Sequence, residues 1–273
     1  MFLESRSRGV AALVVSAVLG ALVSATLGAQ TPAVKSPAAA RPATKADSQL
    51  PPARELIDRY VKAIGGREAV LGHKSLHVTG TYAVPSSGMV GTLEAYSAAN
   101  PNRSLQRVAI PGLGEIASGF DGEHGWTVNP MTGAMLQQGR ELEQARLDAE
   151  FYSELRDPRN YKSITTVEKT TFEGRPCYKV SLVRADGAED FDFYDVETGL
   201  RGGSIITRES PMGTVTSTNV ESDYRKFGNL LQPTTVLLKT MGVEQKLTLV
   251  SAEFDKVDPA VFDPPAAIKA LIK

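Results

Sequence analysis

Two histidines have the spacing that places a pair of metal ligands together on a helix. His73 and His77 lie four residues apart. The run that begins at Leu76, however, has apolar residues at a period of two, which is typical of a strand, and residues four apart along a strand are well separated. The spacing therefore does not predict a metal pair.

The densest acidic stretch, residues 189–197, offers the carboxylate oxygens that a calcium ion requires. It lacks the spacing of the calcium-loop motif. Asp190 and Asp192 alternate with Phe191 and Phe193, which predicts a strand with one solvated face and one buried face. We therefore expect neither a metal nor a cofactor.

Sequence motifs of nucleotide binding and catalysis are weak or absent. Residues 112–117 match the loosest form of a dinucleotide fingerprint, but the next segment reads as a strand, so no helix N-terminus is available for a phosphate and we expect a turn. The sequence has no Gly-x-Ser-x-Gly elbow, no His-Glu-x-x-His and no paired cysteines. Two carboxylates brought together by the fold would still allow acid–base chemistry.

The N-terminus has the features of a secretory signal peptide. Arg6 and Arg8 precede an uncharged apolar run, which ends in small residues at Ala29. We predict a signal peptide at 1–29, cleaved on export to the periplasm; an uncleaved membrane anchor is the alternative. An Ala- and Pro-rich disordered linker is predicted at 30–51, followed by one domain at 52–273.

The charge balance of the exported chain excludes polyanionic partners. Without residues 1–29 the chain has 28 basic and 30 acidic residues, so no basic footprint for nucleic acid or an anionic membrane is expected. Cys177 is the only cysteine, which rules out an intramolecular disulfide. We expect it to be a small buried or half-buried strand residue, and we expect the protein to be a monomer.

The predicted elements form an antiparallel meander with few helices. Leu56, Ile57, Tyr60, Val61 and Ile64 recur at helical spacing before Gly65-Gly66. Twelve short strands follow, most of them joined by links too short for parallel crossovers. We list the predicted strands: 75–83, 89–96, 104–110, 115–120, 125–128, 161–172, 177–183, 191–196, 200–207, 214–224, 234–240 and 243–254.

One helix is predicted within the series of strands, from Glu141 to Leu155. A long meander with two or three helices cannot cover both faces of its sheet, so the sheet should curl with its concave face under the helices. The predicted fold class is α+β and mainly antiparallel β: a curled half-barrel sheet with an N-terminal helix and an inserted lid-like helix over an apolar cavity.

Short motifs occur in a defined order between Leu76 and Pro265. A Pro-Asn pair is followed by Asp-Gly, by a Trp strand ending in Asn-Pro, and by an Asp-x-x-Thr-Gly-Leu turn; a Phe- and Pro-containing segment closes the domain. In this order the motifs resemble the LolA-like superfamily of periplasmic lipoprotein carriers and outer-membrane lipoprotein-sorting proteins. The motif residues are Pro101, Asn102, Asp121, Gly122, Trp126, Asn129, Pro130, Asp195, Thr198, Gly199 and Leu200.

The resemblance implies a carrier for lipoprotein acyl chains or lipid, with a donor or acceptor protein in the inner or outer membrane. The well-known carriers of this superfamily have a basic residue directly before the Pro-Asn pair, whereas this chain has Asn100. We therefore expect either a lipoprotein or a lipid as the cargo. Methionine and aromatic side chains suit a cavity for flexible chains. The residues predicted to line the cavity are Met89, Leu93, Phe120, Trp126, Met131, Met135, Leu147 and Phe151.

Three functions follow from these observations. The first is a non-enzymatic carrier that shields acyl chains in the cavity. The second is an envelope-sensing regulatory module of the same fold that binds a membrane protein. The third is a hydrolase or isomerase acting on an apolar substrate, which requires carboxylates that converge in the cavity and one of them with a raised pKa.

Overall fold

The computed structural model describes residues 50–210 and 213–272. The predicted signal peptide and most of the predicted linker lie outside these residues and stay predictions. Among the described residues, no helix is both long and apolar enough to span a membrane.

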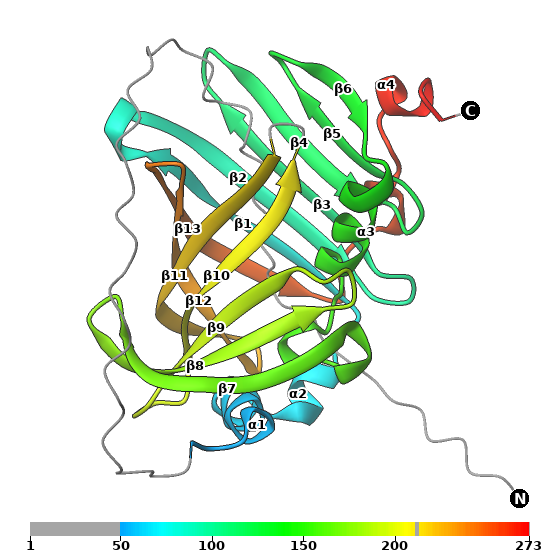
Figure 1. The fold of residues 1–273 in the computed structure, drawn as a ribbon. Helices are drawn as coiled ribbons and strands as arrows, with labels where there is room; N and C mark the ends of the chain where they lie inside the picture. The colour runs from blue at the N-terminus through cyan, green and yellow to red at the C-terminus, as the bar shows by residue number, and fades with distance from the viewer. Residues whose placement is uncertain (1–49, 211–212, 273) are drawn as a thin grey trace, which may run out of the picture.

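The described residues form one 13-stranded sheet in which every neighbouring pair is antiparallel, and which curls without closing into a barrel (Figure 1). The strand order is β6-β5-β4-β3-β2-β1-β13-β12-β11-β10-β9-β8-β7. The strands are β1 (Ser75–Val84), β2 (Met89–Ala98), β3 (Arg103–Ile110), β4 (Gly114–Phe120), β5 (Gly125–Asn129), β6 (Gly133–Leu136), β7 (Tyr161–Phe172), β8 (Arg175–Arg184), β9 (Glu189–Asp195), β10 (Arg201–Ser210), β11 (Gly213–Phe227), β12 (Leu230–Thr240) and β13 (Val243–Phe254).

The predicted mainly antiparallel α+β class is therefore confirmed. The sequence pattern missed β6, which is short and has no buried residue to mark it. The Gly112-x-Gly114 segment forms the turn between β3 and β4, as predicted.

Helix α1 (Ala53–Ala63) covers one end of the curl, with α2 (Arg67–Leu71) beside it (Figure 1). Its apolar stripe is buried against strands from both halves of the sheet, including Val78 of β1 and Leu182 of β8. Gly65 ends the helix at φ +136°, and a Cβ there would lie 2.6 Å from the carbonyl oxygen of Asn229, so only glycine fits.

The segment between β6 and β7 connects the two edge strands of the sheet and carries α3 (Gly139–Asp148). α3 contacts β4 and β5 in one half of the sheet and β10 in the other, and Figure 1 shows it across the concave face. Two 3₁₀ turns follow, η2 (Ser153–Leu155) and η3 (Pro158–Asn160).

The predicted extension of this helix to Leu155 is wrong. α3 ends at Asp148, and the amide of Phe151 donates to the side-chain oxygen of Asn102 rather than to a helix carbonyl. Arg156 then adopts a left-handed conformation at φ +46°. The chain turns at this point because Phe151 enters the apolar core together with Leu155.

We call the face that carries α3 the inner face and the opposite one the outer face. A C-terminal segment with η4 (Pro259–Phe262) and α4 (Ala266–Lys269) covers the outer face of β3–β5. Cys177 is fully buried on the outer face, where it packs with Phe172 and Phe193. The prediction that it is a small buried strand residue is confirmed.

Candidate functional site

A pocket of about 100 Å³ lies on the inner face beneath α3 and the turns that follow it. Its floor comes from β8 to β12, and its roof comes from residues 147–160. The lining is charged, in contrast to the predicted apolar cavity. The apolar contribution comes from Leu147, Leu182, Ile206, Pro233 and Val236, and the charged contribution comes from Asp148, Glu150, Arg156, Asp157, Arg184, Asp190, Asp192, Arg201, Arg208 and Glu221.

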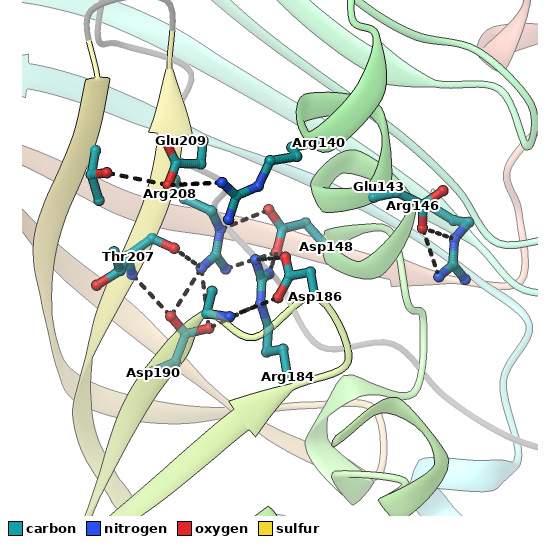
Figure 2. Close-up of polar contacts among 12 residues, drawn as sticks. Arg140, Glu143, Arg146, Asp148, Arg184, Asp186, Asp190, Thr207, Arg208 and Glu209 are labelled. Carbon is teal, nitrogen blue, oxygen red and sulfur yellow. Dashed lines mark hydrogen bonds and ion pairs between the residues drawn. The ribbon is translucent and has the colours of Figure 1, made fainter. Parts of the chain in front are cut away.

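The first ion-pair network joins α3 to the strands, and we call it the α3 latch: Asp148, Arg184, Asp186, Asp190 and Arg208. Arg208 donates to Asp148 at 2.8 and 3.1 Å and to Asp190 at 3.0 and 3.1 Å. Arg184 contacts Asp148 at 3.4 Å and Asp186 at 2.9 Å. Figure 2 shows these side chains converging from α3, the end of β8, the β8–β9 turn, β9 and β10.

The charge of Arg208 is maintained by this network. Burial alone would lower the pKa of the guanidinium, but Asp148 and Asp190 raise it above the usual value. Arg208 therefore acts as a permanent cation that holds the last residue of α3 to β9 and β10. The remaining contacts of α3 are weak, because Gln144 is its only buried residue.

The second ion-pair network consists of Arg201, Glu154 and Glu221, all of which are buried. Arg201 and Glu221 also line the pocket. Arg201 donates to Glu154 at 3.0 Å and to Glu221 at 2.9 Å. Its guanidinium also lies 5.4 Å from the ring centre of Tyr60, and the hydroxyl of Tyr224 donates to Glu221 at 2.8 Å. Burial raises the pKa of Glu154 above its usual value, and the nearby Arg201 opposes that rise.

A neighbouring pair shows why the acidic stretch is not solvated. Arg156 donates to both oxygens of Asp192 at 2.8 and 3.0 Å, and the hydroxyl of Tyr194 donates to the same carboxylate at 2.9 Å. Asp192 is 1% exposed and Asp190 is also buried. The predicted solvated face of this strand is therefore wrong, because arginines distant in sequence supply the partners that water would have supplied.

Four of the six carboxylates that line the pocket are poor candidates for acid–base catalysis. Those of Asp148, Asp190, Asp192 and Glu221 all accept hydrogen bonds from guanidinium groups. Oxygens occupied in this way do not reach a substrate proton. Within the described ranges, no group of three or more His, Cys, Asp or Glu side chains is placed to hold a metal ion.

Three of the predicted cavity residues lie at the pocket or in the apolar cluster beside it. Leu147 lines the pocket. Leu93 belongs to a buried apolar cluster, with Met89 packed against it. This cluster, which we call the apolar wall, adjoins the pocket through Val236, which belongs to both. The apolar wall consists of Tyr82, Val84, Leu93, Val108, Ile110, Ile116, Val236 and Leu247.

The other predicted cavity residues are not brought together. Trp126 is buried on the outer face against Phe262 and Ile268. Phe151 is buried in the core around α1, and Phe120 is buried on β4. Met131 and Met135 are 55% and 44% exposed.

The motif residues of the β2–β3 connection shape a turn and anchor the segment after α3. The Asn100–Pro101 peptide bond is cis. Asn102 donates to Glu150 at 2.9 Å and accepts from the amide of Phe151 at 3.4 Å. This motif therefore positions the roof of the pocket, a role that no sequence pattern indicated.

The other motif residues stabilise turns at the ends of strands. Asp121 accepts from the amides of Glu123 and His124 at 2.8 and 2.7 Å, and Gly122 follows it at φ +110°. Asn129 accepts from the amide after Pro130 at 2.8 Å. In the last motif, Asp195 accepts from the amide and the hydroxyl of Thr198 at 2.7 and 2.8 Å, before Gly199 at φ +73° and Leu200.

Comparisons with known proteins give the class of the fold. No family model and no curated protein matches the sequence. Among solved structures, a LolA superfamily protein from Nitrosomonas europaea superposes with a TM-score of 0.53 at 10% identity, covering 79% of this chain and 99% of that one. A DUF1329 family protein from Desulfovibrio piger gives 0.52 at 10% identity, covering 79% and 97%.

A putative outer membrane lipoprotein-sorting protein domain from Vibrio parahaemolyticus gives a TM-score of 0.50 at 11% identity, covering 77% of this chain and 95% of that one. An open, curled antiparallel sheet with a helix across its inner face defines a half-barrel class of fold. The chain has the LolA-like fold, as its motifs predicted. At these identities the likeness establishes the fold and leaves function to the site.

Asp148→Asn is expected to loosen α3 by weakening the α3 latch. Hydrogen bonds to charged groups contribute about 1.5–3 kcal/mol, so local opening of α3 should become roughly ten- to a hundredfold more frequent. Hydrogen–deuterium exchange of residues 139–148 measures this opening.

The matched control for this prediction is Glu143→Gln on the same helix. Within the described part of the chain Glu143 pairs only with Arg146, and Figure 2 shows the pair on the side of α3 away from the α3 latch. Its exchange should match the wild type. Equal protection of α3 in wild type and Asp148→Asn would show that the α3 latch does not hold the helix.

Proposed function

We propose that the protein is a periplasmic carrier that shields an apolar chain, of a lipoprotein or a lipid, inside the curled sheet and transfers it to a membrane partner. The observation that carries this proposal is the attachment of α3. The helix spans both halves of the sheet, yet it is held mainly by ion pairs at its end and buries little apolar surface. Such a contact opens at lower cost than a packed helix does.

The size of the pocket supports a moving lid. Sites for drug-sized ligands occupy about 300–1,000 Å³, whereas this pocket has about 100 Å³. An acyl chain can enter only if α3 moves and uncovers the adjoining apolar wall. Each CH₂ buried there contributes about 0.8 kcal/mol, so a chain of a dozen carbons gains roughly 10 kcal/mol before ordering costs.

The setting of the carrier rests on the sequence and on the fold. The predicted signal peptide supports export to the periplasm. The LolA-like fold is shared with a putative lipoprotein-sorting protein domain, which supports acyl chains as cargo and a membrane protein as donor or acceptor. The arginine-paired carboxylates support a binding role rather than catalysis.

Native mass spectrometry tests the proposal. We would purify the chain from Gln30 onward from a bacterial periplasm without detergent, and offer it lipid or lipopeptide. One lipid-sized adduct per chain is expected. Ile206→Trp fills the pocket from β10 and should abolish the adduct.

Ile205→Trp is the matched control, because Ile205 lies next in sequence but packs on the outer face. It should retain the adduct, and circular dichroism confirms that both variants fold. A wild-type chain that takes up no lipid or lipopeptide overturns the carrier. A stable complex with a membrane protein in that case would instead support a regulatory module.

A further inference from the structure

Among the described residues that line the pocket, three polar atoms are buried without a hydrogen-bond partner: the hydroxyl of Ser153, Nε of Arg184 and the side-chain oxygen of Asn219. These residues are 8%, 4% and 9% exposed. The Nε of Arg184 lies 3.8 Å from a carboxylate oxygen of Asp190, which is beyond hydrogen-bonding distance. Buried polar groups are normally paired, so three at one pocket indicate a site whose partners come from a ligand.

The other polar side-chain atoms of Asn219 and the terminal nitrogens of Arg184 already have partners. Asn219 donates its amide nitrogen to the hydroxyl of Ser204 at 3.2 Å, which leaves its oxygen as the free acceptor. Arg184 uses its terminal nitrogens on Asp186 and Asp148. The ligand must therefore accept from Nε of Arg184 and donate to the oxygen of Asn219, while the hydroxyl of Ser153 can do either.

The charge of the lining excludes anions. Six carboxylates and four guanidinium groups line the pocket. All four arginines are paired with carboxylates, at 2.7 Å for Arg156, 2.9 Å for Arg184 and Arg201, and 2.8 Å for Arg208. A phosphate or carboxylate would find no unpaired arginine among the described lining residues and would meet a net negative lining. An ammonium group cannot accept from Arg184, so it fails as well.

We infer that the pocket binds an uncharged, hydroxyl-bearing head group of the carried lipid, such as glycerol. A hydroxyl both donates and accepts, as the free atoms demand. The volume of about 100 Å³ is well below that of sites for drug-sized ligands, which suits a small polar group rather than a chain. Val236 joins the pocket to the apolar wall, so the head group and the acyl chain have adjoining sites.

This inference rests on the proposed function, and its test compares two lipids with the same acyl chain. A monoacylglycerol has a neutral head group, and a lysophosphatidic acid adds a phosphate. Competition binding measured by native mass spectrometry should favour the monoacylglycerol by at least tenfold. Ser153→Ala and Asn219→Leu should each reduce that preference about tenfold, because each removes one partner of the head group.

Ser181→Ala is the matched control, because Ser181 is about as buried as Ser153 but bonds Glu189 outside the pocket lining. It should leave the preference unchanged. Equal affinity for the two lipids, or a preference unaffected by Ser153→Ala and Asn219→Leu, would overturn the inference and leave the pocket to ordered water alone.

Failure of the carrier and failure of the head-group site are separable. If neither lipid binds, the carrier proposal fails. Saturation-transfer NMR with free glycerol then tests separately whether the pocket binds a hydroxyl-bearing group. A glycerol signal that Asn219→Leu abolishes and Ser181→Ala retains supports the site. No signal with the wild type overturns it.

Discussion

Arg201→Met is expected to lower the free energy of unfolding by about 3–5 kcal/mol, the cost of breaking a buried ion pair by removing one partner. The substitution leaves Glu154 and Glu221 buried without the guanidinium that both of them contact. Methionine keeps much of the volume of the arginine side chain. The loss of stability therefore comes from the missing charge and not from a cavity. Urea unfolding followed by circular dichroism measures it.

The pH dependence of this loss has a definite sign. Burial raises the folded-state pKa of Glu154, and Arg201 counteracts the rise. Without Arg201 the folded-state pKa rises further above the unfolded value, so the folded variant retains a proton that the unfolded chain releases. The stability of Arg201→Met therefore falls as pH rises through that window, and its deficit against wild type should be larger at pH 8 than at pH 5.

A triple variant provides the control for the Arg201 prediction. Adding Glu154→Gln and Glu221→Gln to Arg201→Met removes the uncompensated charges and should recover most of the lost stability. An Arg201→Met protein whose deficit is the same at pH 5 and pH 8, and which the two glutamines do not rescue, would contradict the account of the second network.

Trp126→Ala is expected to destabilise the protein by about 3–5 kcal/mol, the usual cost of truncating a buried aromatic residue. The indole is enclosed between the sheet and the C-terminal segment, against Phe262 and Ile268. Gly119 makes room for it, since a Cβ at that position would lie 2.6 Å from the indole ring. Thermal unfolding measures the loss.

Met135→Ala is the contrast to Trp126→Ala, because both residues are predicted from sequence to line the cavity. Met135 is exposed, so its truncation should change stability by less than about 0.5 kcal/mol. Neither substitution should alter the head-group preference. Loss of lipid binding in a folded Trp126→Ala protein would indicate that the outer face takes part in carrying cargo.

Local patterns in the sequence are sufficient to predict most of the helices and strands of the fold. The apolar stripe from Leu56 to Ile64 predicts α1, and the period-two runs predict all the strands except β6. Both patterns arise because one side of each element is buried. Alternation assigns residues to two faces, but it does not reveal which face is inside the curl. For that reason Trp126 was predicted on the cavity side and lies on the outer face.

Local sequence patterns could not predict the charged pocket, because the residues that form its ion pairs are far apart in sequence. Arg208 bonds Asp148 across 60 positions, and Arg201 bonds Glu154 across 47. Read one strand at a time, such residues resemble a solvated face. Only the curl of the sheet and the return of the segment after α3 bring the two signs of charge together.

The place of β13 in the sheet has a consequence for how the protein folds. β13 is the last strand of the chain, yet it lies in the middle of the sheet between β1 and β12. Its pairing with β1 joins Leu76 to Phe254, whereas the other strand pairs are neighbours in sequence. Two meanders of local contacts can therefore form early, while this central pairing waits for the whole chain and should limit the folding rate. Until then β1 and β13 are open edges, the kind of surface through which sheets aggregate.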